Sequence, residues 1–176
     1  MNLAFASRAL CDQVFFLLPG RLKELIITAG GENVAPVPIE ESIKKELPCI
    51  SNAMVIGDGR KYLTCLLTMK LEMNVETLEP KEELAQAAKD WCLEKAGVQV
   101  NRIEDINLKI QINKAIQDGL NKVNAGAISN AQKIQKWTIL PTDFSVPGNE
   151  LGPTLKVKRH VVMKKYEHCI ESMYFA

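Results

Sequence analysis

The chain has 176 residues, of which 47% are hydrophobic and 24% charged, so it suits one globular domain with a short extension. The formal net charge of +1 at pH 7 gives no global electrostatic attraction to nucleic acid or to an anionic membrane. Any basic surface must therefore be local.

The five cysteines are scattered and form no C-x-x-C pair, and the only histidines are His160 and His168. No zinc-ligand set can be assembled from them, so we predict no metal site. Cysteines within apolar runs behave as small hydrophobic residues when buried and reduced. We therefore expect reduced thiols and a cytoplasmic location.

Residues 1–19 read MNLAFASRALCDQVFFLLP, and Arg8 and Asp12 interrupt their apolar run. From this pattern we expect no signal peptide, and the segment is too short and polar for us to expect a transmembrane span. We treat residues 1–19 as an extension without an assigned fold. A frayed apolar tail is favoured over a membrane-touching segment, because no basic flank is present, so membrane association is peripheral at most.

The next elements in the chain are a strand, a tight turn and a helix. Residues 24–28 are β-rich and lead into Gly30 and Gly31, a pair typical of a turn with positive φ. Residues 39–47 then have helical spacing, with an acidic start that complements the helix dipole. The predicted inner face of this helix consists of Ile39, Ile43 and Leu47.

Residues 50–57 and 61–70 flank an Asp-Gly-Arg turn and predict a β-hairpin. The second strand alternates in such a way that Leu63, Cys65, Leu67 and Met69 share one face. Apolar residues also occur on its other face, so we expect cover on both sides.

The remaining pattern predicts further helices and one more strand. Pro80 precedes an expected helix over residues 81–96, and residues 136–141 suggest a short strand before a turn-rich loop over 142–154. The expected inward residues of the three helices are, in chain order, Leu84, Ala88, Trp91 and Cys92; Ile112, Ile116, Leu120 and Val123; and, over about 159–173, Val162, Tyr166, Cys169 and Met173. A hairpin, a third strand and several helices favour a small α+β domain.

Two stretches carry a family resemblance. GRLKELIITAGGENVAPVPIEESI, residues 20–43, resembles the linker-and-loop motif of the adenylate-forming enzymes, which include acyl-CoA synthetases, luciferases and peptide-synthetase adenylation domains. LGPTLKVKR, residues 151–159, resembles the C-terminal lysine motif of long-chain acyl-CoA synthetases. GGENV and KRHVVMKKY together are most similar to the bubblegum-type branch.

The resemblance covers roughly residues 20–172 and implies the small C-terminal lid domain of these enzymes, here residues 20–176, with a β-hairpin and a short mixed sheet flanked by helices. Lys156 matches the catalytic lysine of that family. In the family, this lysine lies between the substrate carboxylate and the α-phosphate of ATP during adenylation. A cation suits this place because negative charge gathers on the phosphoryl oxygens. A mobile loop would deliver it as a flexible point charge.

The resemblance also implies roles at the start of the domain. Arg21 matches a residue that holds the nucleotide ribose, and Lys23 matches the hinge about which the domain swings between two poses. The loop that faces the pantetheine tunnel in the second pose matches Gly30, Gly31, Glu32 and Asn33. Glycines allow the thiol-bearing arm to pass close to the backbone.

The motifs of the family's large AMP-binding domain do not occur in this sequence. The implied function is therefore that of the C-terminal portion of a long-chain fatty acid–CoA ligase, a truncated or alternatively started form that is inactive without its N-terminal domain. ATP, CoA and Mg²⁺ are implied for the full-length family, together with a fatty acid substrate, but tight binding to this chain alone is not expected. The alternatives are a non-catalytic module that docks on a full-length synthetase and a by-product without a role.

The basic run near the C-terminus has simpler interpretations. We expect Lys158, Arg159, Lys164 and Lys165 to form a solvated helix face, with a contact to CoA phosphates as the alternative. A nucleic-acid surface is disfavoured because no aromatic residues alternate with these charges. Trp91 and Trp137 are expected in the core, and the two histidines receive no chemical role.

Overall fold

The computed structural model describes residues 25–175, and its centre is a three-stranded sheet of β3 (Ile50–Ile56), β4 (Leu63–Met69) and β7 (Ile134–Ile139). The strand order is β3-β4-β7, with β3 antiparallel and β7 parallel to β4. Gly59 has φ +64° in the tight turn between β3 and β4. The predicted hairpin is therefore confirmed, as is the third strand.

Strand β4 is buried along its whole length, so the prediction of cover on both faces is confirmed. Its first face carries Leu63, Cys65, Leu67 and Met69, which belong to the larger apolar core. Its second face carries Leu66, which belongs to a smaller, separate apolar cluster. The sheet is thus the middle layer of the domain.

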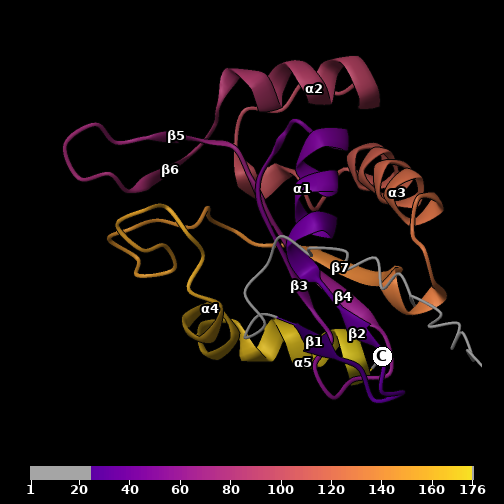
Figure 1. The fold of residues 1–176 in the computed structure, drawn as a ribbon. Coiled ribbons are helices and arrows are strands. Elements are labelled where there is room, and N and C mark those ends of the chain that lie inside the picture. Colours follow the sequence, from indigo (N-terminus) through magenta and orange to yellow (C-terminus); the bar gives the residue numbers. More distant parts are fainter. Residues whose placement is uncertain (1–24, 176) are drawn as a thin grey trace, which may run out of the picture.

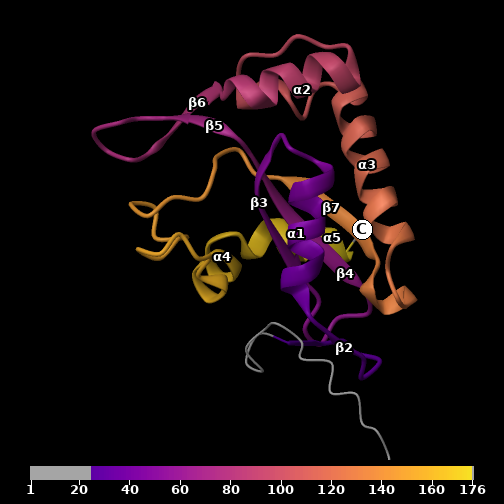
Figure 2. The same ribbon diagram turned by 45° about the horizontal axis from the view of Figure 1, so that its top comes forward.

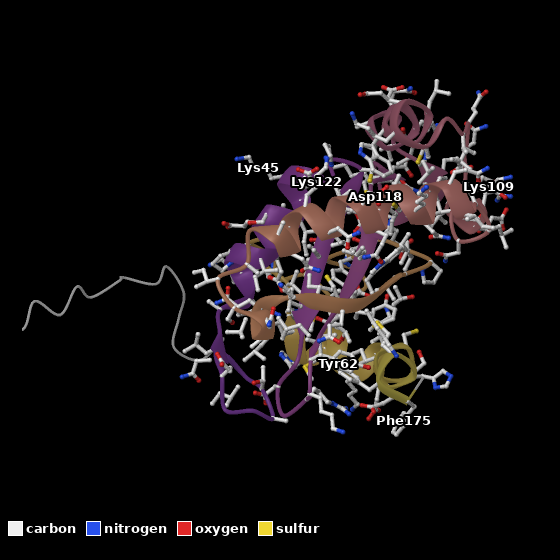
Figure 3. All side chains as sticks on the ribbon, turned by 90° about the vertical axis from the view of Figure 1, so that its right-hand side faces the viewer. Lys45, Tyr62, Lys109, Asp118, Lys122 and Phe175 are labelled. Atoms are coloured by element: carbon white, nitrogen blue, oxygen red, sulfur yellow. The ribbon has the colours of Figure 1, made fainter. Side chains whose placement is uncertain are left out.

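Three helices lie on the side of the first face: α1 (Pro36–Glu46) packs on β3, α3 (Ile110–Ala125) packs on α1, and α2 (Gln86–Ala96) packs on α3. The stripe predicted for α3 is confirmed at Ile112, Ile116 and Leu120, which are all buried. Helices α1 and α3 approach closely, since a Cβ placed on Gly119 would lie 2.4 Å from a Leu47 methyl carbon. Figure 3 shows Asp118 and Lys122 of α3 on the opposite side of the sheet from Tyr62 and Phe175.

The second face is covered by α4 (Arg159–Lys165), α5 (Glu167–Phe175) and the long loop that leads to them from β7. Figure 1 shows these two helices, in yellow, below the sheet and the loop, in orange, to one side. The loop contains no helix or extended strand, as predicted.

Two small antiparallel pairs and two single turns complete the described part. Strands β1 (Ile26–Ile27) and β2 (Asn33–Val34) flank the glycine turn. Strands β5 (Leu71–Met73) and β6 (Pro80–Leu84) form a hairpin that projects from the body in Figures 1 and 2. Short 3₁₀ turns are η2 (Ile103–Asp105) and η3 (Asn130–Gln132).

The helix expected over 81–96 is wrong in its first turn, because Pro80–Leu84 is strand β6 and α2 begins at Gln86. Leu84 is buried as predicted, but it pairs with Leu71 across the β5–β6 hairpin. Leu84 and Ala88 are four residues apart, which is the spacing of a helical stripe, although one residue lies in a strand and the other in a helix. The inward positions in α2 itself are confirmed by the burial of Ala88, Trp91 and Cys92.

Two helix boundaries also differ from expectation. Helix α1 begins at Pro36, so no acidic residue lies in its first turn and the predicted dipole contact is absent from it. The last helix is divided at Tyr166, where φ is −110° and ψ is 23°. Val162, Tyr166 and Met173 are buried as predicted, whereas Cys169 is only partly buried against the smaller cluster and Ile170 is buried beside it.

Candidate functional site

Lys156 lies on a short closed loop, residues 151–157, which we call the lysine loop. Leu151 and Val157 form an antiparallel bridge at its base. Within it, the Gly152 amide donates to the Lys156 carbonyl at 2.8 Å, and the Leu155 amide donates to the Gly152 carbonyl at 2.9 Å. These bonds fix the backbone on both sides of Lys156.

The Lys156 side chain is exposed and makes no ion pair or hydrogen bond within residues 25–175. Its neighbour Leu155 has φ +59° and is 69% exposed. A leucine with positive φ is strained, and such strain persists only where the surroundings fix the backbone. The loop therefore presents an unpaired cation from a constrained backbone.

The segment before the lysine loop is fixed by Glu150, of which only 1% is exposed. Its carboxylate pairs with Lys165 of α4 and accepts a hydrogen bond from the Ser145 amide at 3.4 Å. Gly148 leaves room for this carboxylate, since a Cβ there would lie 2.2 Å from Glu150 Oε2. The loop is thereby joined to α4 through the interior.

The segment after the lysine loop is fixed by Arg159, the first residue of α4. Its Nη2 donates to both carboxylate oxygens of Glu40, at 2.6 and 2.7 Å, and its Nη1 donates to the Val55 carbonyl at 3.1 Å. The Val55 amide in turn donates to Glu40 Oε1 at 2.7 Å. Burial raises the pKa of the Glu40 carboxyl above its usual value, although the Arg159 charge opposes this shift. Helices α1 and α4 and strand β3 meet at this pair.

The roles expected for two of the basic residues are therefore corrected. Arg159 and Lys165 are partners of the buried or largely buried carboxylates Glu40 and Glu150, and they do not form a merely solvated face. Sequence reasoning missed both carboxylates. Glu40 and Arg159 are 119 positions apart, so no local pattern links them.

The glycine turn between β1 and β2 is exposed from Ala29 to Asn33. Gly31 has φ +79°, as the sequence predicts, and the Gly31 amide donates to the Thr28 carbonyl at 2.9 Å. The Ala29 amide donates to the Arg60 carbonyl at 2.9 Å, which ties this turn to the turn of the β3–β4 hairpin. Gly30, Gly31, Glu32 and Asn33 are thus available to a ligand or partner.

The structure does not bring the lysine loop and the glycine turn together. In Figures 1 and 2 the lysine loop lies on the left of the domain, beside α4, whereas the β1–β2 turn lies below and to the right. Arg21 and Lys23, the other predicted site residues, lie outside the described residues.

The lysine loop offers the exposed cation of Lys156 to a phosphate, but the described residues offer no acidic set for a metal. Within residues 25–175, no three His, Cys, Asp or Glu side chains are grouped as ligands, so we derive no step through Mg²⁺. In the same part of the chain, no helix combines the length and apolar character that a bilayer span requires.

Comparison with solved structures supports the fold. The adenylation domain of a carboxylate reductase from Mycobacterium chelonae superposes with a TM-score of 0.62 at 19% identity, over 89% of this chain and 20% of that chain. The adenylation and carrier didomain of the Segniliparus rugosus carboxylic acid reductase gives a TM-score of 0.59 over 88% of this chain and 18% of that one. Both likenesses concern the α+β fold alone.

Sequence comparison places the chain more narrowly. It is 50% identical over 165 residues to long-chain-fatty-acid–CoA ligase ACSBG1 of Rattus norvegicus, covering 93% of this chain and 23% of that protein. It is also 50% identical over 162 residues to ACSBG2 of Xenopus laevis, covering 91% of this chain and 22% of that one. The chain thus spans about a quarter of these relatives' length.

The family model of the AMP-binding enzyme C-terminal domain matches residues 23–176. This match includes the lysine loop, the glycine turn and every described helix and strand. Together with the identity to the bubblegum-type ligases, it shows that the chain belongs to the AMP-binding enzyme C-terminal domain family and is homologous to the C-terminal portion of long-chain fatty acid–CoA ligases.

Proposed function

We propose that this chain acts as the C-terminal lid of a long-chain fatty acid–CoA ligase and that Lys156 supplies its catalytic cation. The observation that carries the proposal is that Lys156 is exposed and has no partner within residues 25–175, on a closed loop of a domain that is 50% identical to such a ligase. Because the chain spans only 22 to 23% of the first two relatives, the proposed partner is an AMP-binding domain.

In the proposed first step, a carboxylate oxygen of the fatty acid bonds to the α-phosphorus of ATP, and the bond from that phosphorus to pyrophosphate breaks. Negative charge gathers on the phosphoryl oxygens as two anions approach. A positioned ammonium group stabilises this charge most strongly in a site from which water is excluded. Lys156 would enter such a site when the lid closes on its partner.

In the second step, the CoA thiol sulfur bonds to the acyl carbon, AMP leaves with the electron pair, and the thiol proton passes to a base or to water. We assign this step to the glycine turn, where Gly31 offers backbone without a side chain. The separation of the turn from the lysine loop supports two alternating poses. Lys23 is the proposed hinge, and Arg21 the proposed ribose contact.

The test is thioester formation from palmitate, ATP and CoA. The purified chain is assayed alone and then with a separately expressed AMP-binding domain of a related synthetase. We expect turnover only on mixing, because the acyl and nucleotide sites require surfaces of both parts. Lys156→Ala should abolish this turnover.

Lys164→Ala is the matched control, since Lys164 is another exposed lysine of the same basic run and should be dispensable. Turnover by the chain alone would contradict the need for a partner. Full turnover by the Lys156→Ala variant would contradict the catalytic assignment. Binding to the partner without any turnover would instead favour a non-catalytic docking module.

A further inference from the structure

We propose that two ion pairs, Glu150–Lys165 and Glu40–Arg159, hold the two ends of the lysine loop and position Lys156 for adenylation. This inference rests on the proposed function of Lys156. It assigns Glu150 and Arg159 as positioning residues, which act through the loop and do not touch substrate. Lys156 would then move with the whole domain and not by opening of its own loop.

The two ion pairs lie at the two ends of the lysine loop. Glu150 immediately precedes the loop and Arg159 follows it after Lys158, so the two residues bracket the segment that bears Lys156. The Lys158 amide donates to the Glu150 carbonyl at 2.7 Å, which closes the bracket through the backbone. Lys158 Nζ also pairs with the Asn149 side chain across the same base. Any movement of one end is therefore transmitted to the other.

The carboxylates of the two pairs are more deeply buried than that of a comparable surface pair. The carboxylate side chains are buried, with Glu150 2% exposed and Glu40 12%, while their partners Lys165 and Arg159 are 47% and 25% exposed. In the Glu46–Lys122 pair, at the other end of α1, the two side chains are 34% and 71% exposed. Charge-assisted hydrogen bonds away from water are stronger and more directional than exposed ones. Loss of either partner would leave a carboxylate or guanidinium poorly paired. Such pairs resist displacement of the segments that they join.

Leu155 of the lysine loop has a strained backbone. Its positive φ lies within the bracket, one residue before Lys156. A backbone of this kind relaxes unless its surroundings hold it. The two ion pairs and the bridge at the loop's base supply that restraint, so releasing them should let the loop relax and misplace Lys156.

Hydrogen exchange of the full chain, without any partner, tests the restraint directly. The reporters are the amides of Gly152, Leu155 and Lys158, which are all donors within the loop or at its base. Glu150→Gln keeps the shape of the side chain and removes its charge, and Arg159→Met removes the other pair. We expect these amides to exchange about tenfold faster or more in each variant, while the amides of β4 keep their wild-type rates.

Glu46→Gln is the matched control, because it breaks an ion pair on the same helix as Glu40 but far from the loop. It should leave loop exchange unchanged. Unchanged loop exchange in Glu150→Gln and Arg159→Met would overturn the proposal. Equal acceleration in the loop and in β4 would also overturn it, since the pairs would then support the whole fold. If Arg159→Met does not fold, Glu150→Gln alone decides.

Palmitate-driven ATP–pyrophosphate exchange, in the same mixture of the two domains, measures adenylation and so tests the consequence for chemistry. In Glu150→Gln, kcat for adenylation should fall about 10²-fold with little change in KM for ATP, because misplacement of a catalytic group by about 1 Å costs this much. Arg159→Lys, which keeps the charge, should recover part of the rate lost in Arg159→Met. A wild-type kcat in both Glu150→Gln and Arg159→Met would overturn the positioning role. If the mixture of wild-type domains is inactive, that result counts against the proposed function. The hydrogen-exchange rates would still show whether the ion pairs restrain the lysine loop.

Discussion

The two faces of the central sheet are built from different interactions. The first face, under α1, α2 and α3, is covered by a continuous apolar core. The second face carries every buried polar residue of the described chain except Thr28, namely Thr64, Thr68, Asp143, Ser145 and Glu150. Asp143 accepts hydrogen bonds from Thr68 at 2.6 Å and from Asn52 at 2.9 Å, which ties the long loop to two strands.

The two faces therefore contribute differently to the stability of the fold and to the placement of the lysine loop. Apolar burial is non-directional and scales with area, so the first face supplies folding free energy without requiring particular bond directions. Buried hydrogen bonds and ion pairs add little net free energy but require a particular geometry. The lysine loop lies on the second face, where geometry is fixed most closely. The fold is thus stabilised mainly on one side and the proposed catalytic group is positioned on the other.

The largest expected effect is the loss of apolar contact on the first face. Leu67 of β4 is fully buried in the larger core. Leu67→Ala should lower the free energy of unfolding by about 2–5 kcal/mol, because it removes buried carbon atoms and leaves a cavity. Urea unfolding measures this loss. Leu67→Met, which nearly conserves volume, should cost less than about 1.5 kcal/mol, and an equal cost in both variants would contradict the cavity explanation.

The next effect concerns the contact between α1 and α3. Gly119→Ala would place a Cβ 2.4 Å from a carbon of buried Leu47, so Leu47 must move. Overpacking of this kind should cost about 1–3 kcal/mol in thermal unfolding. Gly126→Ala is the control, because its nearest atom would be a carbonyl oxygen at an ordinary 3.5 Å. A melting temperature above that of the wild type would contradict the overpacking, because the gain of about 1 kcal/mol in helix propensity would then exceed the cost of the contact with Leu47.

These expectations indicate how far the sequence determines the fold. The β3–β4 hairpin was predictable because an Asp-Gly turn and two alternating strands are local signals. Strand β6 was not, because Pro80 and the spacing of Leu84 and Ala88 suit a helix equally well, and only the pairing with Leu71 decides. The division of the last helix at Tyr166 was not predictable either, because no glycine or proline occurs there.

The site divides in the same way. Lys156 could be proposed from sequence because its motif is local and specific, and the positive φ at Gly31 was predictable because glycine pairs signal such turns. Glu40 and Glu150 were missed because their partners lie on other elements. A carboxylate in a polar turn gives no sign that folding will bury it. Tertiary ion pairs between distant segments are therefore the part that the sequence does not reveal.

A smaller, pH-dependent effect belongs to the second face. Burial, and then the negative charge of Glu150, raise the pKa of Tyr166 from 10.0 to about 12. Above pH 10 the unfolded chain loses this proton before the folded chain, so the stabilisation present below pH 10 is lost as pH rises towards 12. Tyr166→Phe lacks this term. From pH 10 to 12 the unfolding free energy of the wild type should therefore fall relative to that of the variant. A difference between the two proteins that stays constant over this range would contradict the raised pKa of Tyr166.

The smallest effect on stability is expected at Lys156 itself. The side chain is exposed and has no partner within residues 25–175, so Lys156→Ala should change the free energy of unfolding by less than about 0.5 kcal/mol. Calorimetry of the two proteins checks this value. A clear loss of stability in Lys156→Ala would mean that the Lys156 side chain stabilises the loop, and would contradict a side chain that is free to bind a ligand.

The most direct test of the central claim is ATP–pyrophosphate exchange, driven by palmitate, in the mixture of this chain with an AMP-binding domain. This exchange reports adenylation without the thioester step. We predict that Lys156→Ala lowers it about 10²-fold or more, while Gly31→Val, on the distant glycine turn, leaves it near the wild-type rate. Equal loss in both variants, or none in Lys156→Ala, would contradict the assignment of adenylation to the lysine-bearing face.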